Sequence, residues 1–245
     1  MDGGKKLKRK WSAPRKILFC IFLLAFITTA AILLNWWIEG NKAIAANEKL
    51  IKEVVIEQNV NAQGEVGTLF QVDFPKLKQI NSQVVGWIRI PKTNISYPIV
   101  QAEDNDFYLK HNIYKEPSSS GSIFLDYHNQ GDFSDRNIVI YGHNMKNDTM
   151  FAQLKKLDSL GADTIQIYLP DEVKTYSIFS IYNIEAEDYS IQTQITEEQK
   201  ESFIKTLQKR SRKSYDIENW KGEILTLSTC HTENHRTLVH AILQE

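Results

Sequence analysis

The chain has 245 residues, of which 42% are hydrophobic, 24% charged and 11% aromatic, and its formal net charge is −1. That length suits one or two domains and is ample for a buried core. With 11 Gly and 6 Pro, the composition excludes wholesale disorder and collagen-like repeats.

Positive charge is concentrated at the N-terminus. Residues 1–38 hold seven Lys and Arg and one acid, Asp2, so the remaining 207 residues carry 22 basic against 29 acidic side chains, a net charge of −7. A large part with this balance is a poor candidate for binding nucleic acid through a basic face.

An uncharged stretch, ILFCIFLLAFITTAAILLNWWI, fills residues 17–38. A helix of that length measures about 33 Å, enough to cross a hydrocarbon core of about 30 Å. Trp36 and Trp37 suit a membrane interface, and the basic cluster precedes the span. We therefore predict a cytoplasmic basic tail over 1–16, a transmembrane anchor over 17–38, and an extracellular remainder. The alternative is a cleaved signal peptide, but that would have an apolar stretch of only about 7–15 residues and a small-x-small cleavage site.

The two cysteines, Cys20 and Cys230, cannot plausibly pair because Cys20 lies inside the proposed span. The exported part then has one thiol and no disulfide. Such a thiol is either a reactive group or a small buried hydrophobe.

After the anchor, residues 39–73 are interpreted as a juxtamembrane helical segment or linker, and residues 74–245 as one folded domain. A short helix is expected within 74–83. From there the pattern changes to short apolar or alternating runs separated by turn residues, which is typical of strands. The predicted strands are 84–90, 95–100, 121–126, 136–142, 164–169, 175–184, 223–229 and 237–243.

Two helices interrupt the strands, a short one at 149–157 and a longer one at 196–213. The longer helix opens with Thr196 and Gln199 in capping-box spacing and has one apolar stripe. This pattern predicts a mainly β fold with helices (α+β), built as a closed barrel or sandwich of about eight strands.

Candidate chemistry lies where predicted strands end. Cys230 ends LTLSTC, and a thiolate there needs nearby positive charge or a base. If strands 223–229 and 237–243 form an antiparallel hairpin, Arg236 stands opposite Cys230 and can stabilise an oxyanion. His143 ends another apolar run, IVIYGH, with Gly142 allowing a sharp exit, and can move a proton near neutral pH.

Other histidines receive structural interpretations. His111 and His128 are expected to be solvated in a short helix and a loop, and His240 to be a core or edge histidine. Cys230 with His231 and His235 is a conceivable metal site, but its spacing is not that of known zinc sites.

In this order, YGHNM around His143, TLSTC ending at Cys230, and Arg236 in the next strand resemble the sortases, membrane-anchored cysteine transpeptidases of Gram-positive bacteria. The stretches VVGWIRIPKTNISYPIVQAEDNDFYLKH and SGSIFLDYHN are similar to the family's early strands. The resemblance implies a closed sortase-type barrel and the catalytic residues His143, Cys230 and Arg236, with no cofactor and no metal.

Within the family the chain most resembles class B. The features that carry this resemblance are the sequence TLSTC, the helical sequence before the first strand, and the long helix before the cysteine strand. The class implies cleavage after Thr in an NPxTN-like C-terminal sorting motif of exported proteins. The acyl group then passes through a thioacyl enzyme to a peptidoglycan amine. The link HTENH between Cys230 and Arg236 is shorter than the class leads us to expect. Because that loop helps to shape the substrate cleft, its length bears on which sorting motif is bound more than on the catalytic chemistry.

Rival interpretations come from three classes. An L,D-transpeptidase-like crosslinker would place Ser-x-Gly directly before the cysteine, where this chain has Ser228 and Thr229. In a papain-type hydrolase the cysteine precedes the histidine and starts a helix. A non-catalytic membrane-anchored surface protein would keep Cys230 for packing alone.

Overall fold

The computed structural model describes residues 12–60, 67–185, 191–217, 220–230 and 235–244. The chain divides into two compact units, residues 1–42 and 43–245. In the first unit, helix α1 (Ala13–Val54) begins, and its apolar side chains over 17–38 are exposed. This helix is long and apolar enough to cross a membrane.

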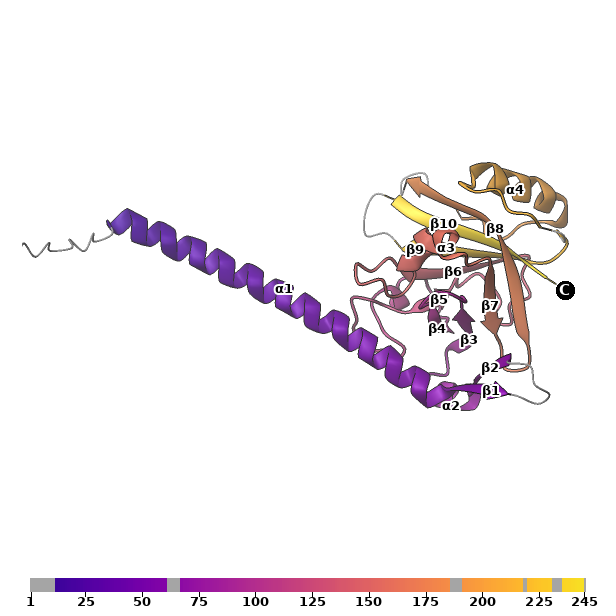
Figure 1. The fold of residues 1–245 in the computed structure, drawn as a ribbon, viewed down its shortest axis with the longest axis horizontal. Helices are drawn as coiled ribbons and strands as arrows, with labels where there is room; N and C mark the ends of the chain where they lie inside the picture. The colour runs from indigo at the N-terminus through magenta and orange to yellow at the C-terminus, as the bar shows by residue number, and fades with distance from the viewer. Residues whose placement is uncertain (1–11, 61–66, 186–190, 218–219, 231–234, 245) are drawn as a thin grey trace, which may run out of the picture. The chain divides into compact units, whose positions relative to one another are not determined.

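In the second unit, eight strands of the described residues close into a barrel with the order β10-β8-β7-β3-β4-β5-β6-β9 (Figure 1). The β4–β5 and β6–β9 pairs are parallel and the other neighbours are antiparallel. The strands are β3 (Val84–Arg89), β4 (Ser96–Val100), β5 (Ile123–Leu125), β6 (Asn137–His143), β7 (Thr164–Tyr168), β8 (Val173–Glu185), β9 (Ile224–Cys230) and β10 (His235–Leu243). The predicted mainly β barrel is therefore confirmed.

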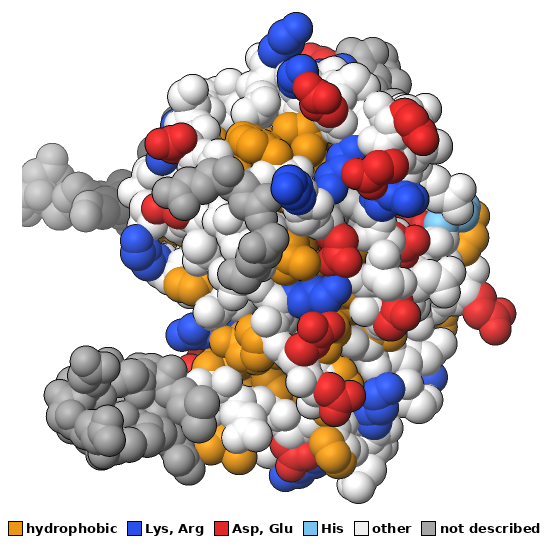
Figure 2. Space-filling view, turned by 90° about the vertical axis from the view of Figure 1, so that its right-hand side faces the viewer, with side chains coloured by type: hydrophobic (Ala, Val, Ile, Leu, Met, Phe, Trp, Pro, Cys, Tyr) orange, Lys and Arg blue, Asp and Glu red, His pale blue; other side chains and the backbone are white. Residues whose placement is uncertain are grey.

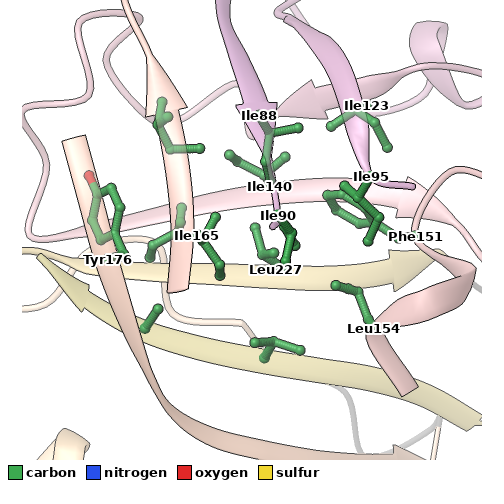
Figure 3. Packing of buried hydrophobic residues seen from close by; sticks show 14 of the residues in the cluster. Ile88, Ile90, Ile95, Ile123, Ile140, Phe151, Leu154, Ile165, Tyr176 and Leu227 are labelled. Atoms are coloured by element: carbon green, nitrogen blue, oxygen red, sulfur yellow. The ribbon is translucent and has the colours of Figure 1, made fainter. Parts of the chain in front are cut away.

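One hydrophobic core fills the inside of the barrel. Inward-facing residues such as Ile88, Ile140 and Leu227 are fully buried in the barrel interior, where β-branched and Leu side chains pack from opposite walls (Figure 3). Phe151 and Leu154, from the segment after β6, complete this core (Figure 3).

Helical segments also pack against the strands. The 3-10 helix η2 (Ala152–Lys156) runs into α3 (Leu157–Leu160), so the helix predicted at 149–157 begins three residues later and is 3-10 in its first part. Helix α4 (Glu197–Arg210) lies over β8 and β10 (Figure 1), and its Ile204 and Leu207 pack on Phe179 and Leu238. Its capping box is present: Thr196 Oγ1 accepts from Gln199 N, and the Gln199 side chain accepts from Thr196 N.

Of the segment 39–73, predicted to be helical or a linker, residues 39–54 lie in the end of α1. The end of α1 buries Leu50 and Val54, and the chain then forms an antiparallel pair of strands, β1 (Val55–Val60) and β2 (Gly67–Val72). Helix α2 (Phe74–Ile80) follows, capped by Asp73, whose side chain accepts from Lys76 N. The hydrophobic cluster here joins Leu50, Val54 and Phe70 to barrel residues.

Surface charge is mixed on the face shown in Figure 2. Acidic and basic side chains are interspersed there, and hydrophobic side chains gather in smaller groups between them. An even mixture of both signs is typical of a solvated surface rather than of a polyanion-binding face.

Candidate active site

Two of the predicted residues end neighbouring parallel strands. The β6–β9 register runs from Asn137 opposite Ile224 to His143 opposite Cys230. Both strands are buried along almost their whole length, and a hydrogen bond from Thr226 Oγ1 to Asn137 Oδ1 at 2.8 Å links them. Paired strands lie about 4.8 Å apart, so the backbones of His143 and Cys230 are immediate neighbours.

Arg236 lies at the start of the third strand. The β9–β10 pairs end at Leu238 opposite Ser228, and the same register continued by two residues brings Arg236 opposite Cys230. The Thr237 backbone N–H donates to Thr229 Oγ1 at 2.9 Å, which ties the two strand ends together. On its other side Arg236 is paired with Ile184 of β8, and its side chain is partly buried.

The His143 ring is held by a backbone carbonyl. Its Nε2 lies 2.8 Å from the carbonyl oxygen of Leu109, at the end of the turn η1 (Phe107–Leu109). Because a carbonyl only accepts, Nε2 carries a proton. The Nδ1 atom is buried and has no hydrogen-bond partner among the residues that the structure describes. In a neutral ring with a proton on Nε2, Nδ1 has the free lone pair and can accept a proton.

Gly142 plays a different part from the one expected. It does not allow a sharp exit, because β6 continues through it to His143. A Cβ atom at this position would lie 2.8 Å from the ring of Phe151 and would also meet Ile123, so glycine is needed for close packing. The His143 carbonyl accepts from Phe151 N at 2.9 Å, and this bond ties the end of β6 to the segment that follows it.

The remaining histidines fall into three environments. His240 is buried, as expected, between Thr226 and Tyr182. His128 is exposed in its loop, and its Nδ1 lies 2.8 Å from Asp126. The solvated interpretation of His111 is wrong: it is partly buried, its ring stacks on Phe107 with centroids 4.1 Å apart, and its Nδ1 lies 2.8 Å from Phe107 O.

No group of three or more potential metal ligands occurs among the described residues. His231, named above for a conceivable metal site, lies outside the described residues, whereas His235 is exposed and lies 3.2 Å from Glu185. The described part of the chain thus offers a cysteine, a histidine and an arginine at the ends of three adjacent strands. These are the residue types that acyl transfer through a thiolate requires.

Comparison with known proteins bears on the family to which the chain belongs. The sortase domain model matches residues 88–244. The chain is 38% identical to sortase B of Listeria monocytogenes over 180 residues, covering 71% of each chain. The structure of Clostridium perfringens sortase B covers 70% of this chain and 100% of its own at 40% identity, with a TM-score of 0.66. Sortase B of Bacillus anthracis in complex with AAEK1 covers 85% of this chain and 99% of its own at 31% identity, with a TM-score of 0.73.

The fold and the matches define a cysteine transpeptidase. The chain belongs to the sortase family and is most like class B.

Sequence reasoning did not identify the Leu109 carbonyl as part of this site. Every residue has a carbonyl, so no residue type could have indicated it. Only the path of the chain between β4 and β5 brings that oxygen to His143.

Proposed function

We propose that this sortase cleaves an NPxTN-like sorting motif at the C-terminus of exported proteins. It cuts after the Thr of the motif and joins the protein to a peptidoglycan amine. In the proposed first step, the Cys230 thiolate attacks the backbone carbonyl carbon of the Thr in the motif. The C–N bond breaks, the leaving amine takes a proton from His143, and a thioacyl enzyme remains. In the second step an amine loses a proton to His143, attacks the thioester and releases Cys230.

The observation that carries this assignment is the register pairing of His143 with Cys230 inside the matched sortase domain. A base on the strand next to the nucleophile is the arrangement that thiolate catalysis needs. Arg236 is proposed to hold the substrate carbonyl and its developing oxyanion, because a guanidinium keeps its charge and offers several donors. The β9–β10 register, continued by two residues beyond Leu238 and Ser228, brings Arg236 opposite Cys230 and supports that role.

The membrane topology is also a proposal. Residues 1–16 would be the cytoplasmic tail, 17–38 the anchor, 39–73 the juxtamembrane segment and 74–245 the extracellular catalytic domain. The long apolar helix and the basic cluster before it support this orientation. An anchored enzyme meets its anchored substrate on the same membrane surface. Protease added to intact protoplasts should remove the catalytic domain; a protected domain would contradict this orientation.

The activity test uses the full chain in detergent micelles. Quenched fluorescent peptides carrying NPQTN-like, LPxTG-like and scrambled motifs are incubated with the wild type, Cys230→Ala and Cys20→Ala, with and without a glycine peptide as amine. Cleavage after Thr that is lost in Cys230→Ala and kept in Cys20→Ala is expected, with the NPQTN-like peptide preferred. The amine should convert hydrolysis product into ligated product.

Alkylation tests the alternative of a non-catalytic surface protein. In the Cys20→Ala variant, Cys230 is the remaining thiol, so iodoacetamide labelling reports on it alone. Fast labelling of the folded protein, faster than in the same chain with His143→Ala, supports the proposed thiolate–imidazole pair. A native thiol that resists labelling and no cleavage of any peptide would support the packing role instead.

A further inference from the structure

The turn that holds His143 is itself packed against a second segment. The Ser122 backbone N–H donates to Tyr108 O at 2.9 Å, and Ser118 N–H donates to Lys110 O at 2.8 Å. The carbonyl between these two, that of Leu109, accepts instead from His143 Nε2. Residues 118–122 are therefore bonded to the turn on both sides of Leu109.

Gly121 makes the closest approach in this packing. Its φ of 56° is in the left-handed region, which glycine adopts without steric cost. A Cβ atom here would lie 2.5 Å from Tyr108 O and 2.8 Å from Leu109 O. Both neighbours are backbone atoms, which cannot turn aside as a flexible side chain can. A larger residue at position 121 therefore forces a shift of the backbone here, and the carbonyls that it meets are those of Tyr108 and Leu109.

The other side of the turn is anchored. Tyr108 is almost fully buried, and its hydroxyl donates to Gln83 Oε1 at 2.7 Å and accepts from Asn81 Nδ2 at 2.8 Å. The turn cannot move as a rigid body to make room without breaking these bonds. Because this side of the turn is anchored, we expect a side chain at position 121 to reorient the peptide group that carries the Leu109 carbonyl.

We propose that Gly121 is a positioning residue for His143. It leaves the space in which the Leu109 carbonyl holds the Nε2 proton, and this keeps Nδ1 free as the proton-accepting nitrogen. The inference rests on the proposed role of His143 in proton transfer. Without that carbonyl, the imidazole can rotate or carry its proton on Nδ1, and in either state it is in the wrong form to accept a proton there.

The chain offers a matched control. Gly161, at the end of α3, has a φ of 63°, but the nearest atom to its Cβ position is Lys92 Nζ at 3.6 Å. Gly161→Ala therefore carries the same backbone strain as Gly121→Ala without displacing a carbonyl. In the full chain in micelles, Gly121→Ala should lower kcat for the cleaved peptide by at least about tenfold, with KM within about twofold. Gly161→Ala should leave both constants close to those of the wild type. Equal kcat losses in the two variants, or a wild-type kcat in Gly121→Ala, would overturn the proposal.

A second measurement does not depend on turnover. In protein labelled with ¹⁵N at histidine, assigned through the loss of one signal in His143→Gln, the neutral ring should carry its proton on Nε2. Gly121→Ala should add the Nδ1–H tautomer, and Gly161→Ala should not. An Nδ1–H ring in the wild type would overturn the proposal even if Gly121→Ala does not fold. If the wild type cleaves no peptide, the proposed function fails, while the ring spectra still decide whether Gly121 and Leu109 position the imidazole.

Discussion

Thr229 and Thr237 join the ends of β9 and β10, one residue before Cys230 and one residue after Arg236. The Thr237 backbone N–H donates to Thr229 Oγ1 at 2.9 Å, and both residues are buried. A side-chain oxygen here takes the place of a strand carbonyl. This bond is therefore expected to keep the cysteine and the arginine level with each other.

Thr229→Val tests that bond, because valine keeps the shape and the β-branch but removes the acceptor. The buried Thr237 N–H would lose its partner, which costs about 1–3 kcal/mol. We expect a lower free energy of unfolding in urea and a lower kcat for peptide cleavage. Thr164→Val on β7 is the comparison for a threonine-to-valine change away from the site. A stability loss in Thr164→Val as large as in Thr229→Val would argue against a special role for the bond.

Arg236→Lys tests the proposed oxyanion role. Lysine keeps the charge but has no planar fork of donors, so it cannot hold an oxyanion in the same geometry. We expect kcat/KM to fall by at least about tenfold, as when an oxyanion-hole donor is removed. The control is Arg136→Lys, whose side chain pairs with Glu197 at 3.1 Å on the surface and should keep its activity. Full activity of Arg236→Lys would remove the arginine from the mechanism.

The N-terminal cap of α4 allows a prediction of stability alone. Thr196→Ala removes the side-chain acceptor of the capping box, which should lower the free energy of unfolding by about 1 kcal/mol. Thr206→Ala, inside the same helix, loses only a hydroxyl that bonds back to Ser202 O, and should be neutral or slightly stabilising. Urea unfolding of the two variants measures the difference. A larger loss for Thr206→Ala would show that the cap does not contribute.

The barrel could be predicted from the sequence because its strands alternate or are uniformly apolar and are separated by turn residues. The run NIVIYG, for example, is buried over residues 137–142 in the structure. The strand pair β1–β2 could not be predicted. Val54 and Val55 continue the helical spacing of the preceding residues, but Val55 pairs with Val72 across a segment that the sequence marks only as a break. Long-range pairing, rather than local propensity, decides the structure there.

The candidate site likewise has residues that could be predicted from the sequence and others that could not. His143, Cys230 and Arg236 could be selected because polar reactive residues follow apolar strands, and the hairpin between the last two follows from their short connection. The Leu109 carbonyl and the close approach at Gly121 depend on how distant segments pack, and no local pattern carries that information. His111 was misjudged for the same reason: its burial comes from Phe107 and from the turn it contacts.

Buried His240 makes the stability of the domain depend on pH. Thr226 Oγ1 donates to Asn137 Oδ1 at 2.8 Å, so it accepts from His240 Nδ1–H at 2.9 Å. The Tyr182 hydroxyl then donates to Nε2 at 3.2 Å. Burial, with a smaller contribution from Arg210, lowers the pKa of His240 from 6.5 to about 3. The ring is therefore neutral in the folded protein at every ordinary pH.

Between about pH 6.5 and pH 3 the unfolded chain binds a proton on His240 that the folded chain does not bind. The folded state is therefore expected to lose stability as the pH falls through this window, by up to about 1.4 kcal/mol per pH unit from this group. His240→Asn should be less stable at pH 7, because it cannot make both bonds of the ring, but its stability should fall less steeply between pH 6.5 and 4.5. Urea unfolding of both proteins across that range gives the two slopes, and carboxylates that titrate in both cancel in the difference. Equal slopes of stability against pH in the two proteins would mean that His240 binds its proton equally well in the folded and unfolded chains. That result is incompatible with a neutral, buried ring.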